Sequence, residues 1–201
     1  MKKWLSICLL ALGLSLFGHG VYMQAKAWLA QVLIEQAWQT TLKSPNKKIK
    51  PWFYADSYPV AQIIWPKHNK RLTVLDGASG RNLAFAPSHF LPAGELGGAD
   101  FGNSQGALIA GHNDTHFAFL KNAKVGEQFS LQLKNGQVQH YSVTHVEVIH
   151  QHNTDFLQQS GLYLLTCYPF DSLASGTDLR WLVSAEISSP EVELGISTTS
   201  S

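Results

Sequence analysis

Cys167 lies where an apolar run of the sequence ends, and other residues of the chain could make its thiol reactive. The cysteine follows Leu162–Thr166 and precedes Tyr168-Pro169, while His112 and Arg180 stand at the ends of two further apolar runs. A cysteine attacks a carbonyl as a thiolate, which needs a base or an imidazolium beside it, and the tetrahedral intermediate needs a donor for its oxyanion. Cys167, His112 and Arg180 can fill these three roles, which together would perform covalent acyl transfer.

Each of these residues also has an ordinary structural interpretation. Free cysteine is among the most buried residue types, His112 is one of nine histidines, and Arg180 could simply flank an apolar strand. The only other cysteine, Cys8, lies in an N-terminal apolar segment, so an exported domain would leave Cys167 without an intramolecular disulfide partner. The proline that follows ends the strand, which favours an accessible position for the thiol.

Metal binding is a competing interpretation of the histidines. His112 and His116 are four residues apart and could share a metal ion if both lay on one helix. Gly111-His112 has instead the character of a strand end, and no glutamate follows His112 at the metallopeptidase spacing. We predict neither a metal site nor a cofactor.

The elements that must position these residues are short strands. Gly, Asn and Pro separate seven apolar or alternating segments, which predicts a closed or nearly closed β structure. Asn135-Gly136 is the strongest hairpin signal and joins the fourth segment to the fifth. Only residues 116–123 look helical within this part. The predicted strands are 60–65, 71–75, 107–110, 129–133, 139–149, 162–166 and 181–185. Neighbouring strands could bring the three candidate residues together on one rim.

The N-terminus predicts export. Lys2 and Lys3 precede nineteen largely apolar residues from Leu5 to Met23, which as a helix at about 1.5 Å per residue would just cross a hydrocarbon core of about 30 Å. Ala25-Lys26-Ala27 has the form of a signal-peptidase site, so a cleaved export signal is the alternative to a retained anchor. The length of the run favours the anchor, and both alternatives place the remaining chain on the extracytoplasmic or periplasmic side of the inner membrane.

Composition and spacing then divide the chain of 201 residues into four parts. We expect a signal-anchor segment over 1–27, a stalk helix and linker over 28–57, one catalytic β domain over 58–187 and a flexible tail over 188–201. The net charge of +1 offers no basic field for a nucleic acid, so nucleic-acid binding is not expected.

Three sequence blocks resemble the signature of the sortases, the cysteine transpeptidases that anchor surface proteins. The blocks are Gly111-His112-Asn113-Asp114-Thr115, Leu164-Leu165-Thr166-Cys167-Tyr168-Pro169-Phe170-Asp171 and Leu179-Arg180-Trp181-Leu182-Val183. The residues of these blocks are most similar to those of the single-target sortases of marine proteobacteria, and the resemblance extends over about Tyr58 to Ala185. It implies a sortase-like eight-stranded β-barrel behind an N-terminal membrane helix and stalk helix.

The resemblance also implies roles for the three residues. Cys167 would be the nucleophile, His112 the general acid and base, and Arg180 the group that stabilises the oxyanion or positions the substrate. The substrate would be a protein with a C-terminal sorting signal of the Leu-Pro-x-Thr-Gly type, cleaved after Thr through a thioacyl enzyme that an amine resolves. Two alternatives stay open: a cysteine peptidase of the cell envelope, in which water resolves the intermediate, and a non-catalytic β domain tethered to the membrane that binds a partner.

Overall fold

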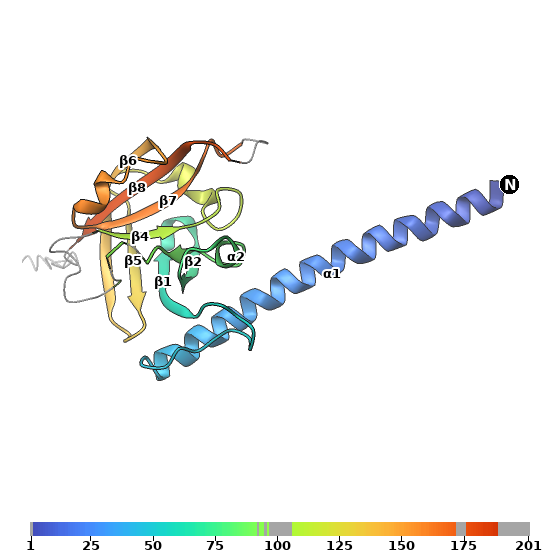
Figure 1. Cartoon of the computed structure of the whole chain (residues 1–201), viewed down its shortest axis with the longest axis horizontal. Coiled ribbons are helices and arrows are strands. Elements are labelled where there is room, and N and C mark those ends of the chain that lie inside the picture. Colours follow the sequence, from blue (N-terminus) through green and yellow to red (C-terminus); the bar gives the residue numbers. More distant parts are fainter. Residues whose placement is uncertain (1, 92, 95, 97–105, 172–175, 189–201) are drawn as a thin grey trace, which may run out of the picture.

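The computed structural model describes residues 2–91, 93–94, 96, 106–171 and 176–188, without the side chains of residues 2, 5, 6 and 8. The predicted tail over 188–201 therefore lies outside the described residues beyond its first position. Within the described ranges the chain forms a long N-terminal helix and a β-barrel at one end of that helix (Figure 1).

The barrel closes through eight strands of the described chain, in the order β1-β2-β3-β4-β7-β8-β6-β5. β5 returns to β1 by antiparallel pairing, and two neighbouring pairs, β2 with β3 and β4 with β7, are parallel. The strands are β1 (Pro59–Trp65), β2 (Lys70–Asp76), β3 (Ser88–His89), β4 (Ala107–Ala110), β5 (Gln128–Leu133), β6 (Val138–His150), β7 (Leu162–Tyr168) and β8 (Leu179–Ile187). The predicted mainly β fold with an eight-stranded barrel is confirmed.

Alternating side chains fill the barrel. In β5 the buried positions are Phe129, Leu131 and Leu133, and the residues between them face outward, as expected for a strand with one buried face. Phe129 stacks on Trp65 with ring centroids 4.5 Å apart. The predicted hairpin is present: β5 pairs antiparallel with β6, and Gly136 in the turn has a φ of 85°, a left-handed conformation that favours glycine.

The remaining elements are helical. α1 (Lys2–Lys43) is one continuous helix through the segments predicted as anchor and stalk. The short elements are α2 (Gly80–Leu83) and three 3₁₀ turns, η1 (Pro66–His68), η2 (Ala118–Asn122) and η3 (Asp155–Gln158). η2 falls in the one part of the domain that was predicted to be helical.

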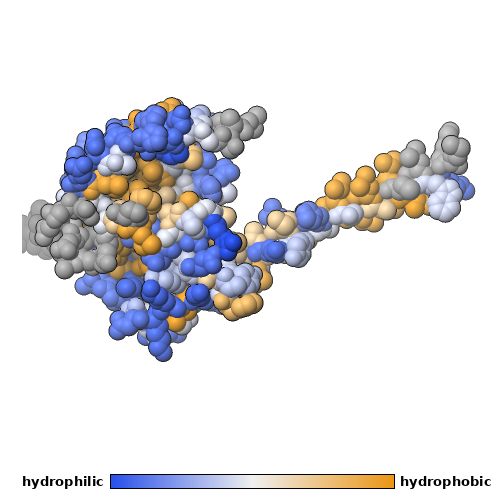
Figure 2. All heavy atoms as spheres, in the orientation of Figure 1, coloured by the Kyte–Doolittle hydropathy of each residue, from blue (hydrophilic) through white to orange (hydrophobic). Residues whose placement is uncertain are grey.

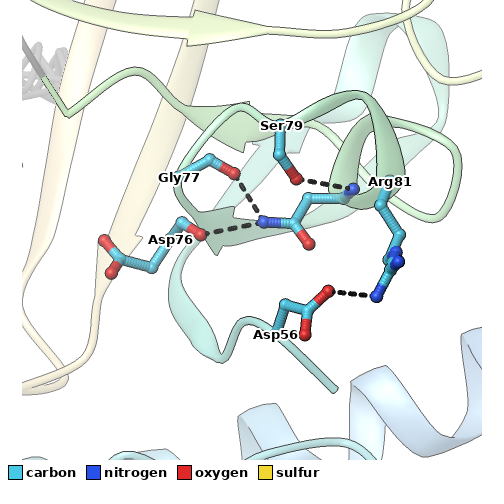
Figure 3. Close-up of polar contacts among 6 residues, drawn as sticks. Asp56, Asp76, Gly77, Ser79 and Arg81 are labelled. Carbon is cyan, nitrogen blue, oxygen red and sulfur yellow. Dashed lines mark hydrogen bonds and ion pairs between the residues drawn. The ribbon is translucent and has the colours of Figure 1, made fainter. Parts of the chain in front are cut away.

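Polar contacts order the connection between β2 and β3 (Figure 3). The Ser79 hydroxyl caps α2 by accepting a hydrogen bond from the Asn82 backbone N–H at 3.2 Å. The Asn82 amide donates to the carbonyl oxygens of Asp76 and Gly77 at 3.2 and 2.7 Å. Arg81 faces Asp56 across this connection in an exposed ion pair of 2.6 Å. These contacts tie the linker after α1 to the end of β2.

The C-terminal part of α1 packs on the barrel. Trp38 and Ile34 are buried, and the Glu35 carboxylate accepts hydrogen bonds from the Gln62 amide of β1 and the Thr73 hydroxyl of β2, at 3.1 and 3.2 Å. Buried residues recur along this side of the helix at Ala30, Ile34, Ala37, Trp38 and Thr41. The stripe has helical periodicity, so the end of α1 is part of the folded domain.

The N-terminal part of α1 extends away from the barrel, and its hydrophobic side chains are visible in Figure 2. Between Leu9 and Met23 its large apolar side chains are at least half exposed. Among the described residues, no helix is long and apolar enough to traverse a membrane.

Candidate active site

Cys167 and Arg180 are directly opposite each other in the antiparallel ladder of β7 and β8. Residues opposite in such a ladder project to the same face, with Cβ atoms about 4.5–5.5 Å apart. Leu162 and Leu164 of β7 belong to the barrel core, so Cys167, at odd spacing from them, lies on the outer face. The thiol and the guanidinium therefore share one face at one end of the barrel, and Cys167 is a half-buried free cysteine.

His112 reaches the same place along β4. Parallel pairing aligns Ala110 with Leu165, and the Gly111 N–H extends the ladder by donating to the Leu165 carbonyl oxygen at 3.1 Å. Continued past Ala110, the same register sets Gly111 beside Thr166 and His112 beside Cys167. The backbone thus places all three predicted residues at one rim, as their positions at strand ends suggested.

Two hydrogen bonds hold the His112 loop against the end of β7, one on each side of the histidine. The buried Thr166 hydroxyl donates to the Gly111 carbonyl oxygen at 2.7 Å. The Asn113 amide donates to the Pro169 carbonyl oxygen at 3.1 Å. His112 itself is exposed, so its ring is accessible while its backbone is tied to the cysteine strand.

The core anchors the same loop through Phe117. The Phe117 ring is fully buried, and its backbone N–H donates to the His112 carbonyl oxygen at 2.9 Å. A Cβ atom on Gly111 would lie 2.7 Å from this ring. Glycine is therefore required at position 111 for close packing against Phe117.

His116, considered above as a second metal ligand, lies close enough to His112 for their charges to interact. Burial and the neighbouring His112 together lower the pKa of His116. In the part of the chain that the structure describes, no group of three or more His, Cys, Asp or Glu side chains is arranged to hold a metal ion.

Hydrogen bonds fix the Arg180 guanidinium. Its Nη1 donates to the carbonyl oxygens of Thr177 and Leu179, and its Nη2 donates to the Gln151 side-chain oxygen at 2.9 Å. Gln151 was not predicted from the sequence. It is 29 residues from Arg180 and becomes its neighbour only through the pairing of β6 with β8.

Aromatic rings support the end of the ladder. Trp181 stacks on Tyr168 with centroids 5.7 Å apart, contacts Phe170 edge-on, and donates from its indole N–H to the Leu120 carbonyl oxygen at 3.0 Å. Trp181 packs against the core cluster and so on the opposite face from its neighbour Arg180. These contacts connect the ends of β7 and β8 to each other and to η2 beneath the candidate residues.

Comparison with known proteins gives one family. The Sortase domain family matches residues 63–188. No curated protein matches the sequence.

Several solved structures have similar folds. Sortase A from Listeria monocytogenes is 19% identical with a TM-score of 0.55, over 65% of this chain and 88% of that one. Sortase C-1 from Streptococcus pneumoniae is 26% identical with a TM-score of 0.57, over 65% and 67%. Sortase C from Clostridium perfringens, solved with the C-terminal cell wall sorting motif, is 18% identical with a TM-score of 0.57, over 82% and 90%. At these identities the likeness supports the shared barrel, and the chemistry has to be argued from the site itself.

Proposed function

The chain belongs to the sortase family, and from that premise we propose that it is a membrane-anchored transpeptidase that joins a protein's C-terminal sorting signal to an amine. One observation carries the proposal. Cys167 and Arg180 form a directly opposed pair on the outer face of β7 and β8, and the β4 register brings His112 to the same rim. A nucleophile, a proton-transfer group and a fixed cation are the three parts that thioacyl chemistry requires.

Acylation would proceed with His112 as an imidazolium and Cys167 as a thiolate. The sulfur attacks the peptide carbonyl carbon, and Arg180 donates hydrogen bonds to the oxyanion that forms. His112 gives its proton to the leaving amine as the C–N bond breaks. The products are a thioester on Cys167 and a free C-terminal fragment.

Deacylation reverses these roles. The acceptor amine attacks the thioester carbon, neutral His112 takes a proton from that amine, and the Cys167 thiolate leaves as the new amide forms. The proposed acylation and deacylation steps consume no redox agent and no cofactor. Because both a thiolate and an imidazolium are required, the rate should depend on two ionisations and decline on either side of an optimum pH.

We propose a sorting signal of the Leu-Pro-x-Thr-Gly type as the substrate, cleaved after Thr. Support comes from the three sequence blocks around His112, Cys167 and Arg180. A related fold, sortase C of Clostridium perfringens, was solved with the C-terminal cell wall sorting motif, so a barrel of this kind accommodates such a segment. Sortases that polymerise pilins carry an Asp-Pro-aromatic motif before the barrel, and this sequence has no such motif there. Attachment of single proteins is therefore favoured over pilin polymerisation.

We further propose that the N-terminal part of α1 anchors the enzyme in the cytoplasmic membrane with the barrel outside. The proposal is supported by the exposed apolar side chains from Leu9 to Met23. Because the C-terminal part of α1 packs on β1 and β2, a membrane anchor in the N-terminal part of the same helix would hold the barrel in a defined orientation.

The test uses the full chain in detergent, because α1 continues without a break from the apolar segment into the part whose residues are buried, from Ala30 to Thr41. The enzyme is incubated with a quenched Leu-Pro-x-Thr-Gly peptide and an amine, and products are followed by mass spectrometry for wild type and Cys167→Ala. A thioacyl adduct and an amine-linked product, both absent from the variant, are expected. Hydrolysis alone would favour a peptidase, and no reaction across a peptide panel would favour a binding domain.

A further inference from the structure

We propose that Gln151 is a positioning residue that holds the Arg180 guanidinium ready for the oxyanion, an inference that rests on the proposed function. Gln151 follows the last residue of β6. Its backbone N–H donates to the Asp178 carbonyl oxygen at 2.7 Å, which extends the β6–β8 ladder by one residue beyond the pair His150 and Leu179. The backbone of Gln151 is thus fixed relative to the strand that carries Arg180.

The orientation of the Gln151 amide follows from its partners. Its Nε2 donates to the Asp178 carboxylate at 2.7 Å. An ionised carboxylate only accepts hydrogen bonds, so the NH₂ group must face Asp178 and the side-chain oxygen is left for another donor. That donor is the Arg180 Nη2 at 2.9 Å. Asp178, an acceptor, and Arg180, a donor, therefore require the same orientation of the Gln151 amide.

This arrangement leaves a defined part of the guanidinium free. Arginine has five N–H donors, and the contacts of the described chain use both N–H groups of Nη1, toward Thr177 and Leu179, and one of Nη2, toward Gln151. The Nε–H and the second Nη2–H remain. Since Arg180 is on the same face as Cys167, these two donors are the ones available to an oxyanion on a Cys167 adduct.

Gln151 supplies the one contact to the guanidinium, among the described residues, that comes from a distant segment of the chain. The two carbonyl contacts come from Arg180's own chain segment and move with it. A long arginine side chain loses rotamer entropy when it is fixed. A contact that fixes it before the reaction removes this cost from the chemical step, as preorganised donors do. The contribution should therefore appear in kcat.

The kinetic experiment compares Gln151→Leu with Gln158→Leu in the full-length enzyme. Gln158 is an exposed residue of η3 with no side-chain hydrogen bond among the described residues, so it is a matched control for the loss of a glutamine amide. We expect Gln151→Leu to lower kcat about tenfold, the loss of one oriented charge-assisted hydrogen bond, with KM within about twofold. Gln158→Leu should keep wild-type kinetics.

A paired exchange tests the donor and acceptor pattern. Gln151→Glu alone keeps an acceptor for Arg180 but places two carboxylates side by side, so its kcat should lie between those of wild type and Gln151→Leu. Combined with Asp178→Asn, the pattern is inverted: the asparagine amide donates to the glutamate, which still accepts from Arg180. The double variant should recover kcat to within about threefold of wild type. No recovery, or a wild-type kcat for Gln151→Leu, would overturn the proposal.

A spectroscopic measurement separates this inference from the proposed function. In substrate-free enzyme labelled with ¹⁵N-arginine, the Arg180 side chain is assigned by loss of its resonance in Arg180→Lys. Slow rotation about its Cζ–Nη2 bond is expected in wild type and in Gln158→Leu, and fast rotation in Gln151→Leu. Unchanged rotation in Gln151→Leu would refute the positioning role. If the enzyme is inactive on every peptide, the proposed function is wrong, but the rotation measurement still shows whether Gln151 holds the Arg180 guanidinium.

Discussion

The Thr166 hydroxyl donates a 2.7 Å hydrogen bond to the carbonyl oxygen of Gly111, and both residues are buried. The bond joins the residue before the candidate nucleophile to the residue before the candidate acid and base. It therefore ties together the two segments whose alignment the chemistry needs.

Replacing Thr166 with valine removes this bond while keeping the β-branched shape. A buried carbonyl left without its partner costs about 1–2 kcal/mol in the free energy of unfolding. Loss of alignment between His112 and Cys167 should lower kcat/KM about tenfold. Urea unfolding and peptide kinetics measure the two effects.

The matched control is Thr144→Val, which removes a longer 3.3 Å hydrogen bond from a threonine hydroxyl to the Ser184 carbonyl oxygen, away from the rim. It should cost under about 1 kcal/mol and leave kcat/KM unchanged. A Thr166→Val enzyme with wild-type kinetics would show that the bond does not align the site.

Gly111→Ala tests the packing of the same loop. The added methyl group would lie 2.7 Å from the Phe117 ring, which is fully buried and has no room to withdraw. The loop that carries His112 must shift, so activity should fall at least about tenfold and stability by about 1–3 kcal/mol. Gly80→Ala is the control, because a Cβ there meets nothing within 4 Å. Equal activity of both variants would contradict the packing argument.

The sequence predicted seven of the eight strands, all but β3, and placed each candidate residue at a strand end, because those features are local. Alternation identifies β5, Asn135-Gly136 identifies its turn, and each candidate residue stands at the end of an apolar run. The parallel pairing of β4 with β7, which brings His112 level with Cys167, joins segments more than fifty residues apart. Periodicity within a segment contains no information about which distant strand becomes its neighbour.

Two features were missed for the same reason. Gln151 has no distinguishing neighbours in sequence, and its function depends on the pairing of β6 with β8. The second half of α1 was predicted as a stalk helix, without any predicted contact to the barrel, whereas Glu35 hydrogen-bonds to β1 and β2 and Trp38, one turn further along, is fully buried. A helical stripe shows that one side is buried but does not show against what.

Trp38→Ala measures how strongly α1 is bound to the barrel. Removing a fully buried tryptophan typically costs about 3–5 kcal/mol. Trp28→Ala on the same helix is the control, because Trp28 is 68% exposed, and it should change stability by less than about 0.5 kcal/mol. Thermal unfolding of the full chain in detergent, followed by near-ultraviolet circular dichroism of the barrel, distinguishes the two. Equal unfolding temperatures would mean that the helix does not stabilise the barrel.

Glu127→Gln should weaken the fold at neutral pH and flatten its response to acid. The Glu127 side chain is 3% exposed and lies 2.9 Å from the Lys67 ammonium and 2.7 Å from the His68 imidazole. Burial by itself would raise the carboxyl pKa, but the hydrogen bonds from Lys67 and His68 outweigh it and hold the pKa of Glu127 below its ordinary value of 4.5. A carboxyl pKa that is lower in the folded state stabilises the fold fully above the unfolded value, and this contribution is lost as pH falls through the folded value.

Wild type should therefore lose stability as the pH falls below about 4.5, and Glu127→Gln should lack this part of the loss. At pH 7 the substitution should cost about 2 kcal/mol, because it removes charge-assisted hydrogen bonds from a buried site. The control is Glu147→Gln, an exposed carboxylate with no salt bridge within the described ranges. Urea unfolding at pH values from 3 to 7 measures both variants. A Glu127→Gln curve parallel to that of wild type across this range would show that the Lys67 and His68 contacts do not contribute to acid sensitivity.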